Sequence, residues 1–144
     1  MPAGALSLVP APGISAVVVD PDGRVGTVAA RDIRVLVDDV QWESLTGRHG
    51  VVFWFGVAGA AAQPVNWVAT QLLLATSGWA AGDVPVLRGP VVVSGRTQNG
   101  APAALTTAHF EALGAWSTLS WRARIALSWR LHREQHRPAA AAQR

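Results

Sequence analysis

The chain has 144 residues, of which 50% are apolar and 15% charged, with a formal net charge of +3 and no cysteine. This length suits about one domain, and this composition excludes disorder through the middle of the chain. The lack of cysteine excludes disulfides, thiolate nucleophiles and cysteine-based zinc sites. We therefore expect a single folded domain with less ordered tips.

The first 13 residues hold three prolines and two glycines and are expected to form a flexible leader. Their apolar run has no basic start and is broken by Pro10 and Pro12, so it does not resemble a secretory signal. A membrane span is disfavoured because Gln63, Pro64 and Asn66 interrupt the central apolar stretch. We expect a cytoplasmic protein that is at most peripheral to the membrane.

The N-terminal third begins with a β-branched run at residues 14–19, which predicts a strand. The turn sequence Asp-Pro-Asp-Gly at 20–23 follows, and residues 24–30 can return as a second strand. Residues 31–46 predict a helix ended by Gly47, although residues 35–37 also suit a strand. The positions near one face of that helix are Ile33, Leu36, Val37 and Val40, and Trp42 is a further candidate for it.

The central residues 51–82 carry no Asp, Glu, Lys or Arg, and any fold must bury this stretch. Residues 51–57 read as a central strand, because a continuous β-branched and aromatic run suits a strand covered on both faces. Asn66 is suited to cap the helix that follows, and Gly78 is suited to stop it. The stripe predicted to pack on the sheet consists of Val68, Leu72, Ala75 and Trp79.

Short strands are expected at 84–87 and 91–94, with a turn at 98–100. Thr107 can then cap a short helix that runs through Leu113 and is closed by Gly114. These elements predict an α/β (α+β) fold, with a small mixed sheet, one packed helix and a C-terminal basic amphipathic helix. The expected division is a leader at 1–13, an α/β domain at 14–114, the basic helix at 115–137 and a disordered tail at 138–144.

The segment 121–131 allows two interpretations. Its odd positions are all apolar, which is the period of a strand, but at helical spacing it also gives two apolar stripes. One stripe is Trp121, Ile125 and Trp129, and the other is Leu119, Ala123, Leu127 and Leu131. We favour a helix, because residues 116–136 lack Gly and Pro and are rich in Ala, Leu and Arg.

This helix carries the candidate contact residues for nucleic acid or a membrane surface, which are Arg122, Arg124, Trp129, Arg130 and Arg133. Arginines can track phosphates, exposed tryptophan can stack on bases, and both residue types suit a lipid headgroup boundary. The competing interpretation, which we favour, makes Trp121 and Trp129 part of the core and leaves the arginines to keep the helix surface soluble.

No pattern in the chain predicts a reaction. His132 and His136 share a helix face, but the zinc-protease motif needs Glu directly after the first His, and no third ligand is evident. Turn chemistry explains Asp20 and Asp22, and a solvated face explains Asp38 and Asp39. We expect no enzyme activity, no catalytic residue, no metal, no cofactor and no small-molecule substrate.

Three segments in this order resemble a family of small actinobacterial plasmid and phage proteins of unassigned function. They are residues 17–23 (VVVDPDG), residues 51–54 (VVFW) with 66–70 (NWVAT), and residues 89–95 (GPVVVSG). The resemblance covers residues 14–113 and implies a mobile-element accessory protein with a compact α/β fold. The chain departs from the family at 57–62 (VAGAAA), where members tend to carry acidic residues, so that any polar site there would be absent.

The 12 basic residues are all arginine, which with abundant Ala, Gly and Val is typical of a very GC-rich genome. Together with the resemblance, this favours a non-enzymatic accessory protein of an actinobacterial mobile element, serving plasmid transfer (conjugation) or spread. Its expected partners are other transfer or replication proteins, or the membrane face. The alternative is a small nucleic-acid-binding regulator that contacts DNA through the C-terminal Arg/Trp helix.

Overall fold

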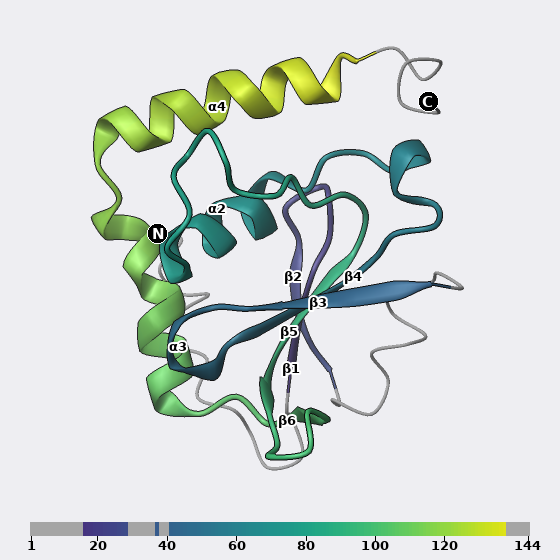
Figure 1. Ribbon diagram of the computed structural model, residues 1–144, viewed down its shortest axis with the longest axis vertical. Helices are drawn as coiled ribbons and strands as arrows, with labels where there is room; N and C mark the ends of the chain where they lie inside the picture. Colours follow the sequence, from purple (N-terminus) through teal and green to yellow (C-terminus); the bar gives the residue numbers. More distant parts are fainter. Residues whose placement is uncertain (1–15, 29–36, 38–40, 138–144) are drawn as a thin grey trace.

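The computed structural model describes residues 16–28, 37 and 41–137, and it confirms the predicted α+β fold. One sheet has the strand order β2-β1-β5-β4-β3, with the short β6 paired to β5, and every described pairing is antiparallel. Figure 1 shows α2 lying between the sheet and α4, with α3 along one side. The C-terminal helix α4 is therefore the outermost helix of the layer.

The strand bounds agree with most of the sequence predictions. The strands are β1 Ala16–Val19, β2 Val25–Val28, β3 Trp42–Thr46, β4 Val52–Gly56, β5 Val91–Arg96 and β6 Pro102–Ala103. The predicted strands at 14–19, 24–30, 51–57 and 91–94 are confirmed within the described residues. Both predicted turns contain a glycine at positive φ, Gly23 at 90° and Gly100 at 84°, a conformation that glycine adopts without strain.

The helices are α2 Trp67–Thr76, α3 Thr107–Gly114 and α4 Trp121–Gln135, with 3-10 turns η3 Arg48–Gly50, η4 Ala60–Ala62 and η5 Ala115–Thr118. The helical interpretation of 121–131 is thus confirmed over the strand. The cap of α3 lies one residue earlier than predicted, at Thr106. Its hydroxyl accepts from the His109 amide, while His109 Nδ1 accepts from the Thr106 amide.

Three local predictions were wrong. Residues 42–46, expected in a helix, form the edge strand β3, because Trp42 and Leu45 pack on opposite faces of the sheet. Residues 29–36 and 38–40 of the same prediction lie outside the described residues. The expected strand at 84–87 makes no ladder: Val84 and Leu87 are buried in the core, and the one bridge nearby joins Val65 to Arg88.

The third error concerns the buried face of α2. Its buried residues are Ala69, Thr70, Leu73, Leu74, Ala75 and Thr76, whereas Val68 and Leu72 are only partly buried and Trp79 is exposed. One apolar stripe does not describe the buried surface of α2, because the helix contacts the sheet on one side and other helices on further sides. Most of its circumference is therefore covered. The polar Thr70 belongs to the buried face because its hydroxyl donates to the Asn66 carbonyl and accepts from the Leu87 amide.

Apolar side chains cover both faces of the sheet. The larger cluster joins β1, β4 and β5 to all three described α-helices and contains Phe53, Leu73, Leu127 and Leu131, each at most 1% exposed. The opposite face carries Ala16, Val52, Trp54 and Val92, together with Val37. On that face the Trp54 indole N–H donates to the buried Ser94 hydroxyl at 2.7 Å, which satisfies both polar groups.

Asn66 connects the end of β1, the start of α2 and the residues just before β5. Its side-chain oxygen accepts from the Ala69 amide at 3.0 Å, as predicted for the cap of α2. Its Nδ2 donates to the carbonyls of Val19, at the end of β1, and Gly89, just before β5, at 2.8 and 2.9 Å. Because Asn66 is fully buried, this one amide fixes the start of α2 against both strands.

Candidate functional site

Helix α4 begins at a sequence-encoded cap. The Ser120 hydroxyl accepts from the Ala123 amide at 3.1 Å, and no Gly or Pro interrupts the 15 residues that follow. The last turn contains His132 and Arg133, where a basic group suits the negative end of the helix dipole. The helix is therefore locally favoured as well as packed.

One side of α4 is part of the main core. Leu127 and Leu131 are 1% and 0% exposed and pack in the larger apolar cluster. Beside them, Arg130 Nη1 donates to the carbonyl oxygens of Ala81 and Val84, at 3.2 and 2.6 Å. The sequence predicts a domain at 14–114 and a separate basic helix. In the structure the two share one core.

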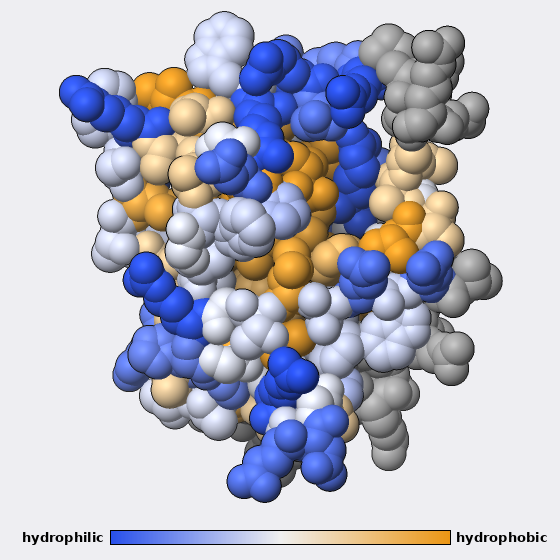
Figure 2. Space-filling view, viewed as in Figure 1, coloured by the Kyte–Doolittle hydropathy of each residue, from blue (hydrophilic) through white to orange (hydrophobic). Residues whose placement is uncertain are grey.

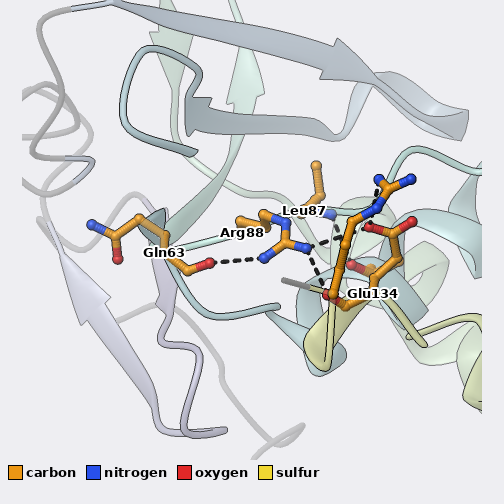
Figure 3. A network of polar contacts seen from close by, with 6 residues as sticks. Gln63, Leu87, Arg88 and Glu134 are labelled. Carbon is orange, nitrogen blue, oxygen red and sulfur yellow. Dashed lines mark hydrogen bonds and ion pairs between the residues drawn. The ribbon is translucent and has the colours of Figure 1, made fainter. Parts of the chain in front are cut away.

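A polar network fixes the C-terminal end of α4 (Figure 3). Arg88 Nη1 donates to the Gln63 carbonyl, and its Nη2 donates to the Glu134 carbonyl at 2.9 Å and pairs with the Glu134 carboxylate at 3.4 Å. The Glu134 carboxylate also lies 3.6 Å from Arg137. Glu134 is the only carboxylate of α4, and it faces this network rather than the outer side of the helix.

The other side of α4 exposes its large apolar residues. Trp121, Ile125 and Trp129, spaced four residues apart, are 66%, 49% and 68% exposed. The favoured interpretation, which placed Trp121 and Trp129 in the core, was therefore wrong. The aliphatic stripe of Leu127 and Leu131 fills the core instead, and this leaves the aromatic stripe outside.

The five predicted contact residues divide into two groups. Arg122, Trp129 and Arg133 are exposed at helical spacing beside Trp121 and Ile125, and we call these five residues the α4 outer face. Within it the Arg122 guanidinium lies 5.4 Å from the Trp121 ring centroid.

The other two predicted residues make contacts with the backbone. Arg130 donates to the loop carbonyls described above. Arg124 Nη2 donates to the Trp116 carbonyl at 3.0 Å, and its guanidinium lies 5.2 Å from the Trp116 ring centroid. Arg124 is still exposed, but its guanidinium is directed along the molecular surface toward η5.

Hydropathy colouring alone does not reveal the α4 outer face. In Figure 2 the surface over α4, along the upper edge, is mostly hydrophilic or near neutral, and a band of apolar residues lies below it. An exposed indole is not orange in this colouring, because the Kyte–Doolittle scale places tryptophan near neutrality. The stripe is identified instead by the exposed fractions of its tryptophans, whose rings are largely apolar.

The other side chains considered as metal ligands or acid–base groups are two histidines and four aspartates. His132 and His136 stack edge to face with ring centroids 4.5 Å apart, and no cluster of three metal-ligating side chains occurs in the described part of the chain. Asp22 accepts from the Arg24 amide and pairs with its guanidinium in the β1–β2 turn, as turn chemistry predicts. Asp38 and Asp39 lie outside the described residues.

Comparison of the chain with protein-family models, with curated proteins and with solved structures finds no match. Within residues 16–28, 37 and 41–137, no helix combines the length and the apolar character needed to cross a bilayer. The α4 outer face, with three exposed large apolar side chains, is the feature of the described residues that most resembles a binding site.

Proposed function

We propose that the chain is a non-enzymatic accessory protein of an actinobacterial mobile element, which serves plasmid transfer or spread by docking through the α4 outer face. The resemblance of residues 14–113 and the arginine-only composition support the mobile-element context. Its partners are other transfer or replication proteins or the membrane face on which they assemble. Its place of action is the cytoplasm, peripheral to the membrane.

One observation carries the docking role. Trp121 and Trp129 are about two-thirds exposed on a helix whose opposite side is locked into the core. Exposing two indoles to water is unfavourable, while burying such rings against a partner supplies much of the binding energy in many interfaces. The surface is also preorganised, because Leu127 and Leu131 hold the helix in place before any partner arrives.

The test compares two matched variants in a mobile element that carries the gene. Trp121→Ser with Trp129→Ser removes both indoles of the outer face, and Trp79→Ser removes an indole that is 47% exposed but does not belong to α4. We expect the double variant to lower transfer or spread as strongly as deletion of the gene, while Trp79→Ser leaves both unchanged. Unchanged transfer and spread after deletion of the gene would remove the proposal.

A second candidate function is a small nucleic-acid-binding regulator. It is favoured by Arg122 beside the exposed Trp121, because an arginine next to an accessible ring suits phosphate contact with base stacking. This function requires DNA affinity that falls steeply with salt and collapses in Arg122→Gln with Arg133→Gln. Salt-insensitive binding, or no binding at low salt, would exclude it.

A further inference from the structure

We infer that the α4 outer face docks on an anionic lipid surface, with the three apolar side chains in the headgroup boundary and the arginines beside lipid phosphates. This inference rests on the proposed function and names the partner of the same site. It commits to a bilayer carrying negatively charged lipids, and a protein or a nucleic acid on this face would contradict it.

The first argument is the shape of the face. Helix α4 has 15 residues and is therefore about 22 Å long, and Figure 1 shows it as a straight outermost element along one edge of the molecule. Trp121, Ile125 and Trp129 form one row along it, spaced about 6 Å apart by the helical rise. A straight row on a convex edge can touch a plane along its whole length, and a bilayer surface is such a plane.

The second argument is the residue chemistry. Tryptophan favours the membrane interface, where its ring meets the acyl boundary and its N–H remains hydrated. Helices that lie in this interface combine such apolar residues with a flanking row of basic residues. Here the exposed Arg122 and Arg133 lie together along one side of the row, and the carboxylate of Glu134 is paired with Arg88 on the inner side. The face is therefore cationic and suits anionic headgroups.

The third argument separates lipid from nucleic acid. A surface that tracks a phosphate backbone takes its affinity from several cations, each of which neutralises a phosphate. On α4 the middle of the exposed side is apolar from Trp121 to Trp129, and two of the four arginines between 122 and 133 are directed elsewhere. Arg124 donates to the Trp116 carbonyl, and Arg130 donates to Ala81 and Val84. An apolar centre with cations at its border fits a lipid boundary better.

The experiment is flotation of the full chain with two kinds of vesicle, one of phosphatidylcholine alone and one of phosphatidylcholine with phosphatidylglycerol. We expect binding to the anionic vesicles and none to the neutral ones, and a loss of binding as salt screens the headgroups. Arg122→Gln with Arg133→Gln should weaken binding about 30-fold. Trp121→Ser with Trp129→Ser should weaken it by at least about tenfold, and Trp79→Ser should leave it unchanged.

Thermal unfolding of each variant shows whether it folds, and the exposed positions make loss of the fold unexpected. The inference is overturned if the wild-type chain does not float with anionic vesicles, or if the double tryptophan variant binds them as tightly. It is equally overturned if an oligonucleotide is bound with this same dependence on Trp121 and Trp129 while vesicles are not. If the double tryptophan variant loses transfer but the wild-type chain does not bind vesicles, the lipid partner alone is defeated. If the wild-type chain binds anionic vesicles through the tryptophans but the double variant transfers normally, the proposed function alone is defeated.

Discussion

Replacing Asn66 by alanine should remove a large part of the stability of this protein. The change deletes the cap of α2, which contributes about 1 kcal/mol. It also leaves the buried carbonyls of Val19 and Gly89 without their amide donor, at about 1 to 2 kcal/mol each. The sum is about 3 to 5 kcal/mol, against a total stability of about 5 to 15 kcal/mol for such domains. We expect the midpoint of thermal unfolding to fall by about 10 to 15 °C.

Urea unfolding followed by circular dichroism measures this loss, and three variants isolate its parts. Thr106→Ala and Ser120→Ala remove only the exposed caps of α3 and α4 and should each lower stability by about 1 kcal/mol. Asn66→Asp keeps the acceptor for the Ala69 amide but turns an oxygen toward both carbonyls, so it should cost at least about 2 kcal/mol. The reasoning is refuted if Asn66→Ala costs no more than the two cap variants, or if Asn66→Asp is as stable as wild type.

Three further changes test how α4 and the edge of the sheet are held, each by urea unfolding. Leu127→Ala should cost about 2 to 5 kcal/mol because its side chain is 1% exposed, and Trp129→Ala should stay within about 0.5 kcal/mol; equal losses would contradict the orientation of the helix. Glu134→Gln should cost about 1 kcal/mol or less, because Arg88 keeps its bond to the Glu134 carbonyl, and a loss above about 3 kcal/mol would show a stronger pair than this geometry supports. Gly47→Ala should cost about 1 to 3 kcal/mol, since its Cβ would lie 2.8 Å from a backbone oxygen at the end of α2; a neutral effect would contradict this contact.

Local patterns predicted the parts of the fold in which one signal dominates. The strand at β1, the turn at Gly23 and the cap at Asn66 each follow from residue types whose preferences agree with their surroundings. The predictions were wrong where tertiary contacts determine the secondary structure. Residues 42–46 can occur in either structure, and pairing with β4 makes them a strand. Val84 and Leu87 looked like strand residues, but they fill the core from a loop.

The residues of the candidate site were predicted, but their orientation was not, and the reason is again tertiary packing. Helical spacing gave two apolar stripes on α4, but it did not show which one faces the core. Leu127 and Leu131 are buried because compact aliphatic side chains fill the space over α2, and the larger indoles of Trp121 and Trp129 remain outside. The same packing directs Arg130 toward the loop carbonyls, a role that no sequence pattern could indicate.

The position of Asn66 also bears on what a family resemblance in the segments that it joins would imply about function. The segments 17–23, 66–70 and 89–95 meet at its side chain, which bonds to the carbonyls of Val19 and Gly89 and caps α2. A pattern that encodes this junction can be kept by proteins with different partners, because it specifies how the sheet and α2 join. Under the proposed function, the residues that specify a partner are therefore expected elsewhere in the chain. Helix α4 follows these segments, and within the described residues its Trp121 and Trp129 stay about two-thirds exposed, outside the core clusters. Experiments on function should therefore alter α4, and experiments on folding should alter Asn66.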